Sequence, residues 1–228
     1  MVSHLSGNPF VFQTDVKSYY ASIEHDVNLE QVAGQIDDPQ VLELVTQYLR
    51  RTVYVDGRYE DVTRGISLGC ALSPIMGALF LKPLDDAMAQ TGLFYARFMD
   101  DWVILAPSRW KLRRVIRIVN QILARLKVQQ HPDKTFIGRV ARGFDFLGYK
   151  IASAGLISVA RRTLEKFALR RSQLYEQGAS DARIGQYVRR WCSWINRGLD
   201  DAWTNSLHAV CDGVLGTLPD QWLREPRA

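Results

Sequence analysis

Apolar and polar positions along the chain follow two different periods, which predict strands and helices in alternation. Runs rich in aromatic and β-branched residues at Pro9–Val16 and Leu93–Ala106 are typical of strands. The second run is interrupted by Asp100 and Asp101, so we expect a hairpin with these two aspartates at its turn. The sequence predicts a further strand at Lys134–Val140.

Helical spacing separates these strands. Pro39–Thr52 carries apolar residues three and four positions apart, and Ser108–Lys127 has the same spacing on one face with basic residues on the other. Both stretches therefore predict amphipathic helices. A Gly- and Ser-rich loop precedes an apolar helix expected over Ser73–Asp86, with Ser73 as its N-cap and Pro74 in the first helical position.

Glycine marks two tight turns. Asp56-Gly57 lies between short β-prone runs, which predicts a hairpin over Val53–Asp61. Arg142–Ser158 is expected to form another hairpin, turned at Ala154-Gly155.

The order of these elements predicts an α+β fold. We expect an antiparallel sheet of the split βαβ, ferredoxin-like type with helices on one face. From Ala160 onward the pattern is helical, with interruptions near Gly178 and Gly198. The chain is therefore expected to hold a first domain over residues 1–157 and a small helical domain over residues 158–228.

Three carboxylates can converge in this arrangement. Asp15 ends the first strand, and Asp100 and Asp101 turn the neighbouring hairpin, so all three can fall on one edge of the sheet. Adjacent carboxylates repel each other, and a bound cation relieves that repulsion. Oxygen ligands without His or thiolate favour Mg²⁺ or Mn²⁺ over zinc, and two such ions suit an in-line phosphoryl displacement. Taken alone, Asp-Asp is equally well explained as a polar hairpin turn.

Charge is concentrated in two stretches of the 228-residue chain. Lys and Arg outnumber Asp and Glu by 29 to 24, a mild excess. Residues 109–127, however, contain seven basic and no acidic residues, and residues 161–197 contain nine basic and three acidic ones. Two helices with positive faces are typical of a surface that follows nucleic-acid phosphates.

Composition excludes some classes of protein. The chain is 47% hydrophobic, enough for a substantial core, but it has no uncharged apolar run of the roughly 18 residues that cross a bilayer. Its first residues lack a basic segment followed by an apolar one, so we expect a cytoplasmic protein without a membrane partner. Its three cysteines have neither paired nor zinc-site spacing.

Five stretches match the motifs of one enzyme family in the family's order: QTDVKSYYASIEHD at Gln13–Asp26, RGISLGCALSP at Arg64–Pro74, FMDD at Phe98–Asp101, HPDKT at His131–Thr135 and FDFLGYKI at Phe144–Ile151. Through them the chain resembles the catalytic portion of a bacterial reverse transcriptase, an RNA-directed DNA polymerase of the group that includes group II intron and retron enzymes. The resemblance implies a palm domain over residues 1–157, lacking most of the fingers, and a helical thumb over residues 158–228.

The resemblance also implies roles for the carboxylates and one lysine. Asp15, Asp100 and Asp101 would hold two Mg²⁺ ions, with Mn²⁺ as the alternative metal. Lys134 would face the triphosphate and protonate the pyrophosphate leaving group. The other interpretation of Lys134 is a solvated lysine at a strand edge.

Further residues are assigned to substrate binding by the same resemblance. Tyr20 would act as an aromatic steric gate that leaves no room for a 2′-hydroxyl, although tyrosines at such positions are often simply core residues. The nucleotide-binding set is Val16, Tyr20, Gly69, Ser73 and Pro74. The set that grips the primer is Phe146, Leu147 and Gly148.

Two departures from the family pattern leave alternatives open. Ser67-Leu68-Gly69 stands where the family usually has Pro-Gln-Gly, and leucine cannot make the hydrogen bond of that glutamine. Few residues precede Asp15, so a separate polypeptide bearing fingers is an expected partner besides RNA template, DNA primer and deoxynucleoside triphosphates. The alternatives to an RNA-directed DNA polymerase are a maturase-like or relic RNA-binding module and a template-independent nucleotidyl transferase.

Overall fold

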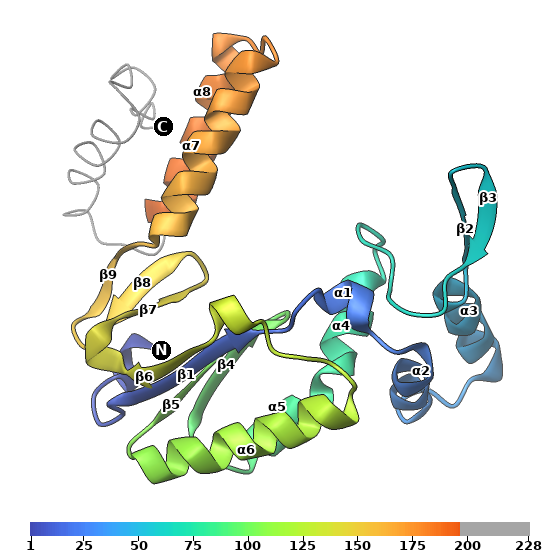
Figure 1. Ribbon diagram of the computed structural model, residues 1–228, viewed down its shortest axis with the longest axis horizontal. Helices are drawn as coiled ribbons and strands as arrows, with labels where there is room; N and C mark the ends of the chain where they lie inside the picture. The colour runs from blue at the N-terminus through green and yellow to red at the C-terminus, as the bar shows by residue number, and fades with distance from the viewer. Residues whose placement is uncertain (197–228) are drawn as a thin grey trace. The chain divides into compact units, whose positions relative to one another are not determined.

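The computed structural model describes residues 1–196, which form two compact units (Figure 1). The first comprises Met1 and residues 3–142, and the second comprises Val2 and the chain from Gly143. The units divide before the position expected from sequence, because strands after Gly143 pair among themselves and not with the main sheet. The helix interruption expected near Gly198 lies outside the described residues.

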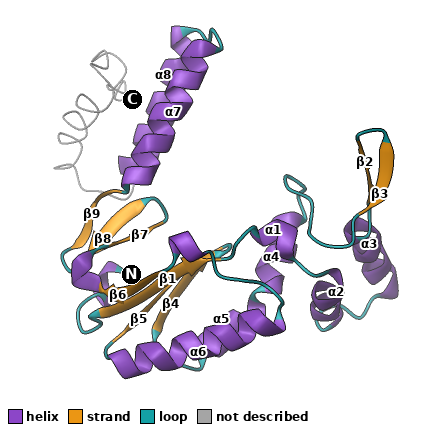
Figure 2. Ribbon diagram, in the orientation of Figure 1, coloured by secondary structure: helices purple, strands orange, loops and turns teal. Residues whose placement is uncertain are grey.

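The first unit is built on a four-stranded sheet in which every neighbouring pair is antiparallel. Its strands, in spatial order, are β4 (Phe94–Phe98), β5 (Asp101–Ala106), β1 (Phe10–Asp15) and β6 (Phe136–Arg139). The helices next to this sheet are α4 (Ser73–Phe80), α5 (Lys82–Ala89) and α6 (Arg109–Arg125). The predicted α+β fold class is confirmed (Figure 2).

Alternation along β1 and β5 places the helix-facing core residues and the two aspartates on opposite faces of the sheet. Phe12, Trp102 and Ile104 are fully buried and belong to the apolar core that includes α6. Because successive side chains point to opposite faces, Asp15 and Asp101 point away from that core. The period of the strands therefore places the carboxylates on the face opposite the helices.

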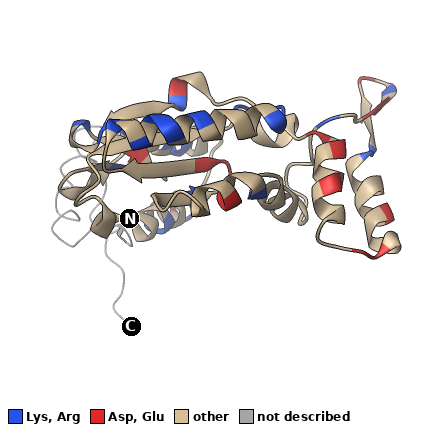
Figure 3. Ribbon diagram, turned by 90° about the horizontal axis from the view of Figure 1, so that it is seen from below, with Lys and Arg blue, Asp and Glu red and all other residues tan. Residues whose placement is uncertain are grey.

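Helix α6 buries the apolar face that the sequence pattern predicts. Ser108 is its N-cap and accepts a hydrogen bond from the Lys111 amide at 3.3 Å. Its buried residues are Leu112, Val115, Val119, Ile122 and Leu123. Burying such a side chain contributes about 1.5–3 kcal/mol. The opposite face carries the basic residues, and Figure 3 shows Lys and Arg along this helix.

Between β1 and α4 the chain forms three helices and a hairpin, and the second helix packs against α4. The elements are α1 (Tyr19–Ser22), α2 (His25–Ala33), α3 (Pro39–Leu49), β2 (Thr52–Val55) and β3 (Arg58–Asp61). Asp38 caps α3 by accepting hydrogen bonds from the Gln40 and Val41 amides. The predicted hairpin around Asp56-Gly57 is confirmed.

The turn between β4 and β5 lies one residue earlier than expected. Phe98 pairs with Asp101, so the two turn residues are Met99 and Asp100, and Asp101 is the first residue of β5. Met99 takes a left-handed conformation with φ of 55°. The prediction of an Asp100-Asp101 turn was therefore wrong by one position. Because Asp101 is a strand residue, its side chain projects from one face of the sheet.

The apolar helix expected over Ser73–Asp86 is broken in two. Pro83 lies in the first turn of α5, where its ring excludes continuation of α4 through Leu81. Ser73 is the first residue of α4, and Leu72 is the N-cap, so the predicted serine cap was wrong.

The second unit combines a small sheet with two helices. Its elements are β7 (Phe144–Phe146), β8 (Tyr149–Ala152), β9 (Gly155–Val159), α7 (Arg161–Glu176) and α8 (Asp181–Asn196). The expected single hairpin is thus a three-stranded meander, turned at Leu147-Gly148 and at Ser153-Ala154. Phe167 of α7 stacks on Trp191 of α8, with ring centroids 3.9 Å apart. No helix within residues 1–196 has the length and apolarity needed to cross a membrane.

Candidate active site

The ends of two paired strands and the turn before one of them bring the predicted carboxylates together. Asp15 at the end of β1 lies opposite Asp101 at the start of β5, and Asp100 precedes Asp101 in the turn. Lys134 Nζ donates a hydrogen bond to Asp15 Oδ2 and forms an ion pair with it. Gln13 Nε2 donates to Asp101 Oδ1 at 3.1 Å.

These carboxylates are held in an environment that disfavours their charge. Burial is the main cause that raises the pKa of the Asp101 carboxyl to about 6; the hydrogen bond from Gln13 opposes it, and repulsion from Asp15 and Asp100 adds to it. The pKa of Asp100 is also raised, again chiefly by burial, with Asp15 adding and Lys134 opposing. A cation bound beside them would remove this penalty.

The carboxylate oxygens of Asp15, Asp100 and Asp101 are chemically suited to a divalent cation. Asp15 is 6% exposed, and its Oδ1 is buried without a hydrogen-bond partner among the described residues. An unpartnered buried carboxylate oxygen is costly unless a cation satisfies it. Across residues 1–196, no three His, Cys, Asp or Glu side chains are gathered closely enough to form a ready-made metal site. The cation that compensates Asp15 here is the ammonium of Lys134.

Lys134 is positioned by a turn that is tied to β1. It ends the 3₁₀ turn η2 (Pro132–Lys134) and precedes β6, so it is not the strand residue that the sequence predicted. The His131 amide donates to the Asp15 carbonyl at 2.9 Å, and the hydroxyls of Thr14 and Thr135 lie 2.7 Å apart. These contacts hold the turn against the end of β1, and thereby hold the lysine beside the carboxylate.

The aspartate turn is supported by a residue to which the sequence assigned no role. Arg97 of β4 donates from Nη1 to the Met99 carbonyl at 2.7 Å and from Nε to Asp85 Oδ1 at 2.8 Å. Tyr95 also donates to Asp85 Oδ1, at 2.8 Å. Arg97 is therefore a positioning residue for the turn. No sequence signal indicates this, because the role depends on α5 meeting β4.

Tyr20 lies against the same turn. Its hydroxyl donates to Met99 Sδ at 3.8 Å, and its ring contacts Tyr19. A Cβ at Gly77 would lie 3.2 Å from Cε1 of both Tyr19 and Tyr20, so a side chain at this position would require the two rings to shift by a few tenths of an ångström. Gly77 is a second residue that the sequence did not single out. Val16, by contrast, is 2% exposed and belongs to the apolar core.

The loop before α4 contains the other residues assigned to nucleotide binding. Gly69 has φ of 83°, a left-handed conformation that favours glycine. Ser73 is buried, donates to the Ser67 carbonyl and lies 2.9 Å from the Tyr48 hydroxyl, so its Oγ is engaged in holding the loop. Pro74 is exposed in the first turn of α4. Leu68 is 79% exposed.

The residues assigned to the primer grip form a tight turn in the second unit. Leu147 and Gly148 connect β7 to β8 with φ of 49° and 86°, and Phe146 before them is buried. A Cβ at Gly148 would lie 2.7 Å from the Trp194 ring, so this position requires glycine for space as well as for conformation.

Comparison with known proteins identifies the family. Residues 1–151 match the family described as "Reverse transcriptase (RNA-dependent DNA polymerase)", and the chain belongs to it. Among curated proteins, Protein YkfC of Escherichia coli K12 is 20% identical over 62% of this chain. An uncharacterized 91 kDa protein in a cob intron of Schizosaccharomyces pombe is 22% identical over 58% of this chain. The matches span 46% and 16% of these two relatives' own lengths.

Solved structures share the fold at low identity. Apo telomerase from Candida tropicalis is similar with a TM-score of 0.59 and 15% identity, over 82% of this chain and 36% of that one. Telomerase from Candida albicans, in complex with a fragment of telomeric RNA, is similar with a TM-score of 0.58 and 13% identity, over 83% of this chain and 39% of that one. The reverse transcriptase fold predicted from the motifs is confirmed.

Proposed function

We propose that this chain catalyses RNA-directed DNA synthesis, extending a DNA primer on an RNA template with deoxynucleoside triphosphates. One observation carries the proposal: in a chain of the reverse transcriptase family, Asp15 lies opposite Asp101 in the strand register, Asp100 precedes Asp101 in the turn, and Lys134 is ion-paired with Asp15. Residues 1–157 would act as the palm and residues 158–228 as the thumb.

Asp15, Asp100 and Asp101 would hold two divalent ions, Mg²⁺ or Mn²⁺. When bound, such ions stabilise negative charge on the reacting phosphate and lower the pKa of a hydroxyl. The chain's own residues supply the rest. Lys134 holds a proton beside Asp15, Arg97 fixes the turn that carries Asp100, and Tyr20 restricts space next to the site.

A nucleic-acid-binding module with little catalysis is the second candidate. It is favoured by the ion pair of Lys134 with Asp15, which satisfies one oxygen of a carboxylate that a polymerase would use for metal. The two candidates differ in whether Mg²⁺ displaces the lysine.

Primer extension separates these functions. The intact chain is given a labelled DNA primer on an RNA template, Mg²⁺ and all four deoxynucleotides, with parallel reactions on a DNA template and without template. Templated products of the expected sequence support the proposal. Products without template indicate a terminal nucleotidyl transferase. Clean duplex binding with no product at any Mg²⁺ or Mn²⁺ concentration indicates the binding module.

Tyr20→Ala is expected to relax the choice of sugar. Removing the ring beside Met99 opens space next to the site, so incorporation of ribonucleotides relative to deoxynucleotides should rise on the order of tenfold. The measurement is kcat/KM for each nucleotide in single-nucleotide extension. Tyr20→Phe keeps the ring and should keep the wild-type ratio; an unchanged ratio in Tyr20→Ala would assign the tyrosine to the core alone.

Asp101→Asn is expected to stabilise the chain above pH 6 in the presence of a chelator. The pKa of Asp101 rises from its ordinary 3.8 to about 6 on folding, so the folded state binds the proton more tightly than the unfolded state does. Stability therefore falls as the pH rises from 4 to 6, and Asn removes this loss. After allowance for solvent screening, the gain at pH 7 is about 1 kcal/mol, or roughly 2–4 °C in Tm.

Thermal unfolding from pH 4.5 to 7.5 in EDTA measures this difference. Asp86→Asn is the control, because Asp86 is exposed and makes only a surface ion pair with Lys82. The difference in Tm between Asp101→Asn and the intact chain should grow with pH and level off above pH 6. A difference independent of pH would contradict the explanation.

A further inference from the structure

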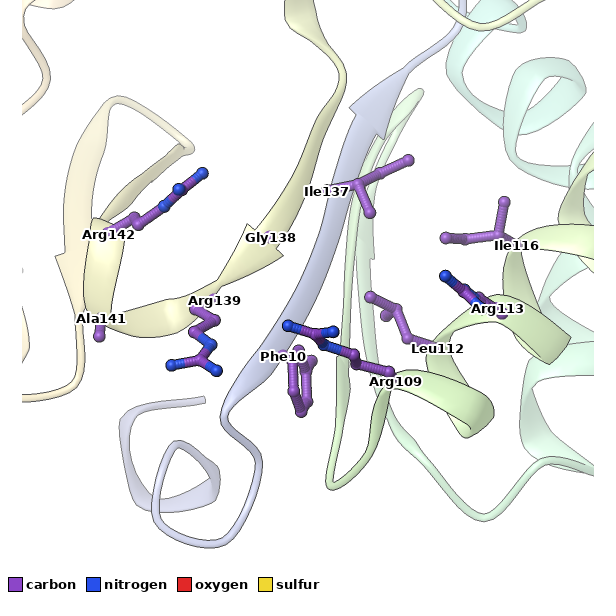
Figure 4. A pocket seen from close by; sticks show the side chains of 10 residues that line it. All are labelled: Phe10, Arg109, Leu112, Arg113, Ile116, Ile137, Gly138, Arg139, Ala141 and Arg142. Atoms are coloured by element: carbon purple, nitrogen blue, oxygen red, sulfur yellow. The ribbon is translucent and has the colours of Figure 1, made fainter.

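A second site of defined chemistry lies between the N-terminal half of α6 and the edge strand β6. It is a cavity of about 670 Å³ within the first unit. Four arginines line it, and its other walls are largely apolar: Arg109, Arg113, Arg139 and Arg142 stand around Phe10, Leu112, Ile116, Ile137, Gly138 and Ala141 (Figure 4). We call this cavity the arginine pocket. It has no acidic residue in its lining.

The arginine pocket is on the opposite face of the sheet from the carboxylates. Phe10 and Asp15 lie on the same strand but five positions apart, so their side chains point to opposite faces. Arg139 pairs with Phe10 in the register of β6 against β1 and shares its face. At about 3.3 Å per residue, the two positions are also separated by roughly 16 Å along the strand. The pocket is therefore not part of the candidate active site.

Positive charge in the arginine pocket is uncompensated. Within residues 1–196, none of its four arginines forms an ion pair with a carboxylate. Arg109 and Phe10 lie next to each other (Figure 4), with the guanidinium carbon 5.9 Å from the ring centroid, and the guanidinium carbon of Arg113 lies 5.4 Å from the ring centroid of Trp110. Guanidinium groups held on aromatic rings with free donors are suited to bidentate contacts with phosphate.

The surroundings favour an extended anion over a small one. Arg109, Arg113 and Arg117 follow each other at four-residue spacing, which places them on one side of α6 with a rise of about 6 Å per step. Such a row matches successive phosphates of an extended strand. Trp110 is 77% exposed beside Arg113 and offers a ring on which an unpaired base can stack.

We propose that the arginine pocket and Trp110 bind a single-stranded segment of nucleic acid, with phosphates on the arginines and a base on Trp110. This site is separate from the one where the proposed function places template and primer. It would hold RNA on the helix-covered face of the sheet, on the other side of the sheet from the carboxylates. The proposal does not require the chain to polymerise.

Binding of a fluorescein-labelled 12-nucleotide oligouridylate, measured by anisotropy in EDTA at several salt concentrations, tests the pocket. The double variant Arg113→Gln with Arg139→Gln should bind on the order of tenfold more weakly at 0.1 M salt. Its slope of log K against log salt should shrink by about 1.4, since each lost phosphate contact on a single strand contributes about 0.7. The matched control is Arg114→Gln with Arg125→Gln, exposed arginines of α6 outside the pocket, and it should lose less than threefold.

Equal losses in the two double variants would overturn the proposal, because they would reflect net charge and not a site. Photocrosslinking of an oligonucleotide carrying 5-iodouracil gives an independent readout, and the crosslinked peptide should contain Trp110. Crosslinks confined to residues near Asp15 would also overturn it. Pyrophosphate or poly-aspartate displacing the oligonucleotide at equal charge concentration would replace it with a small-anion site or an acidic protein partner, respectively.

Binding without metal or nucleotides is independent of extension, so the two proposals fail separately. Selective loss in the pocket variant, in a chain that never extends a primer, keeps the pocket and removes the proposed function. Extension by a chain whose two double variants bind alike does the reverse. Both double variants should keep the Tm of the intact chain, since each of the four arginines is exposed.

Discussion

Asp100→Asn should reduce primer extension by at least about 10³-fold while leaving the chain folded. Asparagine has the shape of aspartate but no charge, and it cannot hold a divalent ion as firmly as a carboxylate. The pKa of Asp100 is raised by burial and by Asp15, so its replacement relieves repulsion in the metal-free chain. The loss of activity should therefore accompany an unchanged or higher Tm.

Single-turnover extension of a labelled primer on an RNA template measures the effect. Asp86→Asn removes one exposed carboxylate from α5 and should extend the primer at the wild-type rate. Mg²⁺ should raise the Tm of the intact chain and of this control, but not that of Asp100→Asn. Extension by Asp100→Asn within tenfold of wild type would remove Asp100 from the proposed site.

The sequence predicted those parts of the fold that local pattern determines. Strand β1, the β4–β5 hairpin and helix α6 follow from short-range periodicity, and the sheet faces follow from alternation once the strands pair. Motif order indicated that Asp15 and the aspartates of the hairpin would come together, and the register of Asp15 against Asp101 brings them together. Local pattern thus predicted the elements themselves, and the order of the motifs related two carboxylate positions that are distant in the sequence.

Details that depend on distant contacts were missed. The turn falls at Met99 and Asp100 because the pairing register with β5 selects it, and a run of apolar residues around Asp-Asp does not specify register. Arg97 supports the turn only because Asp85 of α5 lies beside it. Gly77 matters because two tyrosine rings pack on α4. In each case one partner is supplied by another element of the fold.

Lys134→Ala should lower the rate of the chemical step on the order of 10³-fold, within the range typical of general acids. In the proposed reaction, the primer 3′-oxygen bonds to the α-phosphorus and the bond from that phosphorus to the bridging oxygen breaks. The 3′-hydroxyl gives up its proton to water, and pyrophosphate leaves with the electron pair and takes a proton from Lys134 Nζ. The lysine is held beside Asp15 by η2, so the donor is already at the end of the sheet where the carboxylates lie.

A purely electrostatic role for Lys134 makes a different prediction. Lys134→Arg keeps the positive charge beside Asp15, but a guanidinium is a poor proton donor because its pKa is well above that of an ammonium group. If Lys134 is the general acid, both variants are slow. In that case the rate of the intact chain should fall at alkaline pH, and the rate of Lys134→Ala should not. If the lysine only balances the charge of Asp15, Lys134→Arg restores the wild-type rate and the pH profile is unchanged. Rapid-quench kinetics of the intact chain and the two variants across pH 6–10 decides between these roles. If arginine restores the rate, water and not Lys134 protonates the pyrophosphate.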